Sequence, residues 1–330
     1  MGLPVPRSLY ASHCPDCATL AGPLSRRQTL GALLFASLMP PTAARAETGL
    51  PLSGYIYEDT RRLVSLVEAA ATLIEQEGRP AFGLGISNLS RWPADDFYLF
   101  AYTLDGVCVF HQAEPILVGR NLIEVRDVLG KPVVQHITSI GARLEPQAAD
   151  WVFYQWESGQ QLSPAWKGSY VRKAVAPDGT VMVIGSGGYN LKIERQVVRR
   201  NVLRAVAAIE ARGETVFAEL VSPASPYRMP DGYLFVMDMT GRTIVDPAYP
   251  GLGGGRDMSL FRDAVGVPVV ATVLERLAHQ DEVWMQFLMP RPGDKIPARK
   301  ALFACKVGVN GRTLVVGADF FLPTAIWMRV

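Results

Sequence analysis

The sequence predicts an α+β protein made of two consecutive copies of one unit, each a helix packed on an antiparallel sheet of about five strands. Two observations predict this fold. The chain repeats itself at an offset of about 135 residues, and within each copy the spacing of apolar residues changes from helical to period two. With 330 residues and 49% hydrophobic content, the chain can form two domains of ordinary size.

The repeat covers nearly all of the chain after its first 50 residues. The stretch "AATLIEQEGRPAF" from Ala70 matches "AVAAIEARGETVF" from Ala205, and "FYLFAYTLDGVCVFH" from Phe97 matches "GYLFVMDMTGRTIVD" from Gly232. Toward the end of each copy the offset falls to 133, as small loop changes would produce. We therefore expect a first domain at residues 47–192 and a second at 193–330.

Each copy begins with a helix. Apolar residues recur at spacings of three and four from Leu63 to Ile74, and again from Val198 to Ile209, which indicates one buried face on each helix. Gly78 and Gly213 follow these stretches as helix stop signals.

Strands follow each helix. In the first copy a hairpin turns at Gly106, and period two places Tyr98, Phe100 and Tyr102 on one face of its first strand. The same period predicts that Val107, Val109 and His111 share a face of the second strand. Further strands are predicted at 151–156, 167–175 and 180–189, and in the second copy at 283–289, 300–307 and 313–321.

The order of these segments resembles the Cache family of extracytoplasmic sensory domains. The segments that carry the resemblance are "DDFYLFAYTLDG", "HQAEPILVGRN", "DVLGKPV", "WVFYQWES", "KGSYVRK" and "GSGGY", with a weaker second set from "DGYLFVMDMTG" to "GADFF". The resemblance implies a PAS-like sheet with a pocket on one face for a small organic ligand, often a carboxylate. Family members usually adjoin transmembrane helices and signalling domains, which this sequence does not show.

Residues 25–46 are typical of a cleavable export signal. Arg26 and Arg27 precede an apolar run from Leu30 to Met39, and an Ala-Arg-Ala site ends at Ala46. The "SRRQTL" box resembles a twin-arginine signal. We expect cleavage near Ala46 and a periplasmic protein without a transmembrane anchor.

The resemblance and the residue chemistry together point to a ligand site in the first copy. Lys167 is the candidate cation for a carboxylate, because an apolar wall strengthens the attraction of a fixed charge. A solvated lysine at a strand start is the alternative, and His111 could equally be structural. The candidate ligand-binding residues are Lys167, His111, Tyr102, Tyr154, Trp156 and Tyr170.

The second copy predicts a different, secondary site. There Asp246 replaces His111, and phenylalanines replace Tyr154 and Tyr170, so the site loses two hydroxyl groups and gains a carboxylate. A role in pairing a cation, or a structural role, suits it better than binding the same anion. The candidate residues are Asp246, Lys300, Tyr233 and Trp284.

Other classes of function have little support in the sequence. A formal charge of +2 without a basic block does not indicate nucleic-acid binding. The histidines lack metal-ligand spacing, and no nucleophile motif is present, so we expect neither cofactor nor enzymatic activity.

We expect a sensor or solute-binding protein with a membrane sensor or transporter as partner. The alternatives are an interaction module without a ligand and, less favoured, a cofactor-carrying enzyme. Cys108 and Cys305 are either two buried apolar side chains or a disulfide.

Overall fold

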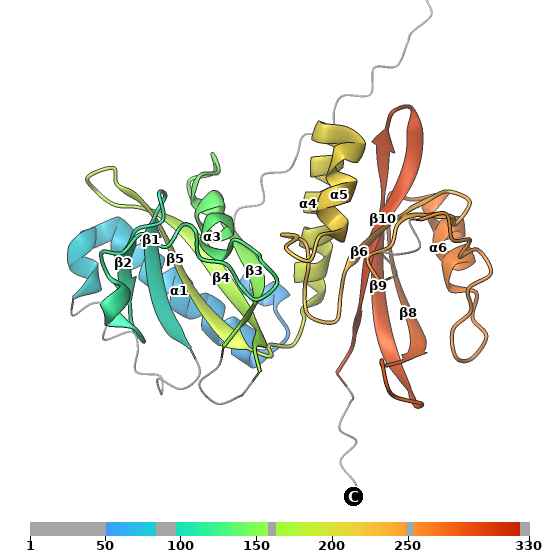
Figure 1. Cartoon of the computed structure of the whole chain (residues 1–330), viewed down its shortest axis with the longest axis horizontal. Coiled ribbons are helices and arrows are strands. Elements are labelled where there is room, and N and C mark those ends of the chain that lie inside the picture. The colour runs from blue at the N-terminus through green and yellow to red at the C-terminus, as the bar shows by residue number, and fades with distance from the viewer. Residues whose placement is uncertain (1–50, 84–96, 158–162, 249–253, 324–330) are drawn as a thin grey trace, which may run out of the picture. The chain divides into compact units, whose positions relative to one another are not determined.

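The computed structural model describes residues 51–83, 97–157, 163–248 and 254–323 (Figure 1). The expected export signal and its cleavage site lie outside this part of the chain. The first repeat contains η1 (Leu52–Gly54), α1 (Glu58–Glu77), η2 (Arg79–Phe82), β1 (Tyr98–Thr103), β2 (Cys108–His111), η3 (Pro115–Leu117), α3 (Val133–Gly141), β3 (Ala149–Trp156), β4 (Ala165–Val175) and β5 (Val181–Tyr189).

The second repeat has the same order of long helix, hairpin strands, short helix and three further strands, with one added helix, α5. It contains α4 (Arg195–Arg212), η4 (Gly213–Thr215), α5 (Val216–Val221), β6 (Leu234–Asp238), β7 (Thr243–Val245), α6 (Val269–Leu277), β8 (Glu282–Pro290), β9 (Pro297–Val309) and β10 (Arg312–Phe321). Gly78 and Gly213 end the long helices α1 and α4 with positive φ angles of 68° and 65°, a conformation that glycine adopts without steric cost.

Two five-stranded antiparallel sheets confirm the predicted fold class. The strand order is β2-β1-β5-β4-β3 in the first sheet and β7-β6-β10-β9-β8 in the second. Strands in equivalent positions of the two orders are equivalent in the repeat. The predicted helices and strands are all present, within a few residues of the expected ends.

The short helices α3 and α6 were not predicted from the sequence. Each has nine residues and begins directly after a proline, Pro132 or Pro268, in a stretch that reads as a loop.

The loop before each helix is fixed by one aspartate. Asp127 accepts hydrogen bonds from the backbone N–H groups of Leu129, Lys131 and Gln155, and Asp263 accepts from those of Val265, Val267 and Leu288. These bonds tie the loop to the edge strand of each sheet.

The first sheet has two differently packed faces. On one face, which we call the α1 face, Leu99, Tyr170 and Ile184 pack in a cluster with the apolar side of α1. On the other, which we call the α3 face, Phe100, Val171 and Val183 pack with residues of α3. Figure 1 shows α1 and α3 on either side of this sheet.

A β-bulge changes one predicted face. The pairing of β1 with β2 runs Phe100 to His111, Ala101 to Phe110 and then Tyr102 to Cys108, so Val109 is an extra residue in the ladder. His111 lies against the rings of Tyr98 and Phe100, whereas Val109 packs on the α1 cluster. The prediction that Val109 and His111 share a face is therefore wrong.

The two cysteines of the described residues, Cys108 and Cys305, are buried free thiols. Burial raises the pKa of both thiol groups, in the case of Cys305 to about 11, so they are unreactive apolar side chains at neutral pH. No helix in the described ranges is long and apolar enough to cross a lipid bilayer.

Candidate functional site around Lys167

Lys167 lies on β4, an inner strand between β5 and the edge strand β3, on the α3 face of the first sheet. The strand register places it between Tyr154 of β3 and Tyr189 of β5. Only 1% of its surface is exposed. The Nζ atom donates a hydrogen bond to the hydroxyl oxygen of Tyr98, and it lies 3.9 Å from the centre of the Tyr98 ring and 5.2 Å from that of Tyr189. A single ammonium group is therefore enclosed by tyrosine rings.

Gly187 of β5 leaves room for this lysine. A Cβ atom at this position would lie 2.8 Å from Cε of Lys167 and 2.3 Å from the hydroxyl of Ser169. A side chain here would displace the lysine stem. The glycine therefore lets Lys167 run across the sheet face.

The charge of Lys167 has no internal counterion in the described part of the chain. No carboxylate of those residues lies within ion-pair distance of Nζ. Burial lowers the pKa of Lys167 from 10.5 to about 7, and the more distant Glu114 offsets only part of this effect. Near neutral pH the group is thus poised between ammonium and amine, and an anionic ligand would stabilise the ammonium form.

His111 supplies a neutral donor beside the lysine. Its ring centre lies 5.1 Å from that of Tyr98, and Nδ1 accepts a hydrogen bond of 2.9 Å from the backbone N–H of Glu114. Burial lowers the pKa of His111; Glu114 opposes this and Lys167 adds to it. The neutral ring therefore carries its proton on Nε2, which can donate to a ligand.

Tyr154 and Trp156 lie on the same face as Lys167. The Tyr154 hydroxyl is 2.9 Å from the hydroxyl of Ser169, and the Trp156 ring meets the Tyr154 ring edge-on at 5.7 Å. Tyr102 is on this face too, packed against Phe100 at 5.4 Å within the apolar cluster near α3. The structure therefore groups five of the six predicted residues, with Tyr102 deeper in the core.

Tyr170 does not belong to this group. It is three residues after Lys167 in a strand, and an odd separation places the two side chains on opposite faces. Tyr170 is fully buried on the α1 face, where its hydroxyl donates a 2.7 Å hydrogen bond to Glu68 of α1. Its position there corrects the prediction that it lines the pocket with Lys167.

The second repeat has an equivalent lysine with a different partner. Lys300 pairs with Phe287 and Phe321 in the sheet, as Lys167 pairs with Tyr154 and Tyr189. Its Nζ lies 2.7 Å from a carboxylate oxygen of Asp319, and 4.7 Å from the centre of the Phe321 ring. This cation is already neutralised within the fold.

The other residues predicted for the second site are divided between faces. Tyr233 directly precedes β6, where strand alternation places it on the face of Phe235. Asp246 is near enough to Asp319 to raise the pKa of that carboxyl, although burial is the larger cause. Trp284 is on the opposite face, against Phe303 at 4.9 Å, because it pairs with Phe303 rather than with Lys300. Trp284 therefore does not share a site with Lys300.

Residues 88–322 match the family described as Cache domain. The chain belongs to the Cache domain family. Membership of this family supports a ligand-binding, sensory role and points to a non-enzymatic domain.

Solved structures similar to this Cache protein include sensor domains. A periplasmic sensor domain of a chemotaxis protein is 23% identical, with a TM-score of 0.31, over 39% of this chain and 92% of that chain. A Cache chemosensory domain described for carboxylic acid recognition is 19% identical, with a TM-score of 0.31, over 39% and 90%. The ligand-binding domain of the Pseudomonas aeruginosa PAO1 amino acid chemoreceptor PctC, solved with GABA, is 12% identical, with a TM-score of 0.28, over 78% and 89%. No curated protein matches the chain.

Sequence reasoning missed several of the residues that surround Lys167. The residues predicted for the site do not include Tyr98, Ser169, Gly187 or Tyr189. Strand alternation could have identified two of them. Tyr98 is an even number of residues from Tyr102, and Ser169 is an even number from Lys167, so the members of each pair lie on the same face. Strand pairing then brings Gly187 and Tyr189 beside them.

Proposed function

We propose that this Cache protein binds a small organic carboxylate through Lys167 on the α3 face of its first sheet. The observation that carries the proposal is a buried ammonium group that has no carboxylate partner among the described residues, in a fold whose second copy has such a partner. A buried cation is costly unless it is paired, and a ligand carboxylate would supply the pair.

The surrounding donors suit the same ligand class. The Nε2–H of His111 and the hydroxyl group of Tyr98 can donate to carboxylate oxygens, while Trp156 adds apolar wall. In the second repeat Asp319 and Asp246 would repel an anion. We therefore propose a single carboxylate site, in the first repeat.

The proposal also covers the setting of the protein. We infer that residues 1–46 are a twin-arginine-type signal peptide, removed near Ala46, and that residues 47–192 and 193–330 are tandem Cache modules. The mature protein would then work in the periplasm and present its ligand state to a membrane sensor or transporter.

A thermal-shift screen of the mature protein tests the proposal. Each carboxylate is compared with its amide and its amine analogue at equal ionic strength. A carboxylate at about 100 times its dissociation constant adds about 2.7 kcal/mol to the free energy of unfolding, whereas the uncharged amide should add far less. No stabilisation by any organic acid or amino acid would contradict a carboxylate-binding function.

A further inference from the structure

A second polar site lies away from Lys167, around a small cavity of about 30 Å³. Residues of α3, β3 and α4 contribute to its lining, together with the segments that follow α3 and precede β6. Those that matter here are His136, Ser139, Arg143, Trp151, Arg204 and Pro226. One water molecule needs roughly 10–15 Å³ measured in this way, so the cavity has room for a group larger than one water.

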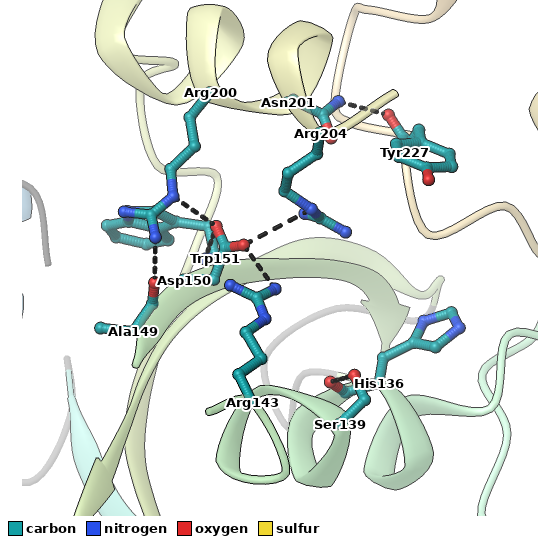
Figure 2. A network of polar contacts seen from close by, with 10 residues as sticks. All are labelled: His136, Ser139, Arg143, Ala149, Asp150, Trp151, Arg200, Asn201, Arg204 and Tyr227. Atoms are coloured by element: carbon teal, nitrogen blue, oxygen red, sulfur yellow. Dashed lines mark hydrogen bonds and ion pairs between the residues drawn. The ribbon is translucent and has the colours of Figure 1, made fainter. Parts of the chain in front are cut away.

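Three arginines converge on one carboxylate at this place (Figure 2). Asp150 of β3 accepts a 2.8 Å hydrogen bond from Arg143, and its oxygens lie 3.5 Å from Nε of both Arg200 and Arg204. The Asp150 side chain is only 4% exposed. Burial alone would raise the pKa of this carboxyl, but Arg204, Arg200 and Arg143 outweigh burial and lower the pKa.

The network carries more positive than negative charge. Even without Arg200, the guanidinium groups of Arg143 and Arg204 face the one carboxylate of Asp150 in the described part of the chain, and Asp150 also accepts a 2.8 Å hydrogen bond from the backbone N–H of Trp151. The opposite ratio occurs elsewhere in the same sheet, where Arg172 is paired with two carboxylates, Glu68 and Glu75, both at 2.9 Å. Excess positive charge is thus a local property of the cavity.

His136 adds a buried polar atom to the same cavity. Its Nδ1 atom is buried, and no hydrogen-bond partner for it exists among the residues that the structure describes. Burial, with Lys131 and Arg204, lowers the pKa of His136 to about 4, while Asp127 opposes the change. The neutral ring can therefore donate one N–H into the cavity without adding a further charge.

We propose that this cavity binds a small oxyanion, held by the guanidinium groups of Arg143 and Arg204 and by His136. The planar, forked guanidinium group matches the oxygen atoms of phosphate, sulfate and carboxylate groups. An oxyanion would compensate the excess charge around Asp150. Since Arg143 follows α3 and Arg204 lies in α4, the bound ion would also join the first repeat to the first helix of the second.

Isothermal titration of inorganic phosphate into the full chain tests this site. Ionic strength is held constant by replacing sodium chloride, and sulfate and acetate are titrated in parallel to identify the oxyanion class. We expect saturable binding of at least one of the three with a stoichiometry of about one. Absence of saturable binding for all three would overturn the proposal and leave the cavity to water.

Arg204→Gln should weaken this binding at least tenfold, because it removes a charge-assisted partner. Arg212→Gln is the matched control, since Arg212 lies on the same helix in an exposed pair with Glu219 and should leave binding unchanged. If Arg204→Gln does not fold, Arg143→Gln takes its place, with the same expected loss. Equal affinity in folded Arg204→Gln and Arg143→Gln would overturn the proposal.

Lys167→Ala separates this site from the proposed carboxylate site. We expect phosphate binding to be unchanged in this variant. Loss of phosphate binding in Lys167→Ala, with normal binding in Arg204→Gln, would assign the anion to Lys167 instead. Phosphate and sulfate also stabilise proteins in general, because they are excluded from the protein surface. This general effect is not saturable and would be the same in every variant, so it is distinguished from binding at the cavity.

Discussion

Lys300 and Asp319 form a close ion pair in the second sheet, with Nζ and a carboxylate oxygen 2.7 Å apart. The strand register shows which residue of the first repeat occupies the position of Asp319. Lys300 pairs with Phe321 as Lys167 pairs with Tyr189, so Asp319 stands where the first repeat has Gly187. One substitution thus supplies the buried cation of the second repeat with a permanent counterion. In the described part of the first repeat, Lys167 has no such counterion, and we propose that a ligand carboxylate takes its place.

Carboxylate affinity should fall as pH rises above about 7. Free Lys167 loses its proton around this pH, so binding at higher pH must take up a proton, and affinity drops by up to about tenfold per pH unit. The groups that face it do not titrate between about pH 7 and 9, because burial lowers the pKa of His111 and raises those of Tyr98, Tyr154 and Tyr189.

Titration calorimetry at several pH values measures this dependence. Buffers with different ionisation enthalpies report the proton taken up on binding above pH 7. Constant affinity from about pH 6 to pH 9, without proton uptake, would mean that Lys167 does not contact the ligand.

Two tyrosine-to-phenylalanine variants should separate the two faces of the first sheet. Tyr98→Phe removes the hydroxyl that accepts from Lys167, so ligand affinity should fall several-fold. Tyr170→Phe removes a hydrogen bond to Glu68 on the α1 face, which should cost about 1 kcal/mol of unfolding free energy and leave affinity unchanged. Chemical denaturation and calorimetry on both variants check this. A similar loss of affinity in both would contradict the assignment of faces.

Asp319→Gly should destabilise the second repeat by about 3 kcal/mol, because it leaves Lys300 as a buried cation without its partner. Asp281→Gly is the control, since that aspartate is exposed and pairs with Lys306 at the surface, where such pairs contribute about 1 kcal/mol or less. Denaturant unfolding compares the two variants. Equal losses would show that the Lys300–Asp319 pair is not specially important to the fold.

Much of the fold could be predicted because the internal repeat, the helical spacing and the strand period of two are all visible in the sequence. The helix from Leu63 to Ile74, its end at Gly78 and the antiparallel strands all follow from residue spacing. The helix α3 could not be predicted, because nine residues after Pro132 are too few for a clear helical period. The bulge at Val109 also leaves no mark in the spacing.

The sequence could predict the cation of the candidate site, Lys167, but not all of the residues that surround it. The chemistry of Lys167 and His111 indicates the site, whereas the prediction for Tyr170 is wrong because an odd separation along β4 places it on the opposite face from Lys167. The pair of Lys300 with Asp319 depends on the register of β9 and β10. That register follows from the two-residue turn Asn310-Gly311, a strong hairpin signal that fixes which residues face each other.

The most direct measurement of the central claim is the affinity of a carboxylate, identified in the screen, for Lys167→Ala and for Lys300→Ala. Calorimetry near pH 6 keeps Lys167 mostly protonated in the parent protein. We predict at least a tenfold loss of affinity in Lys167→Ala, as expected for a lost charge-assisted hydrogen bond, and unchanged affinity in Lys300→Ala. Unchanged affinity in Lys167→Ala, or an equal loss in both variants, would contradict the account.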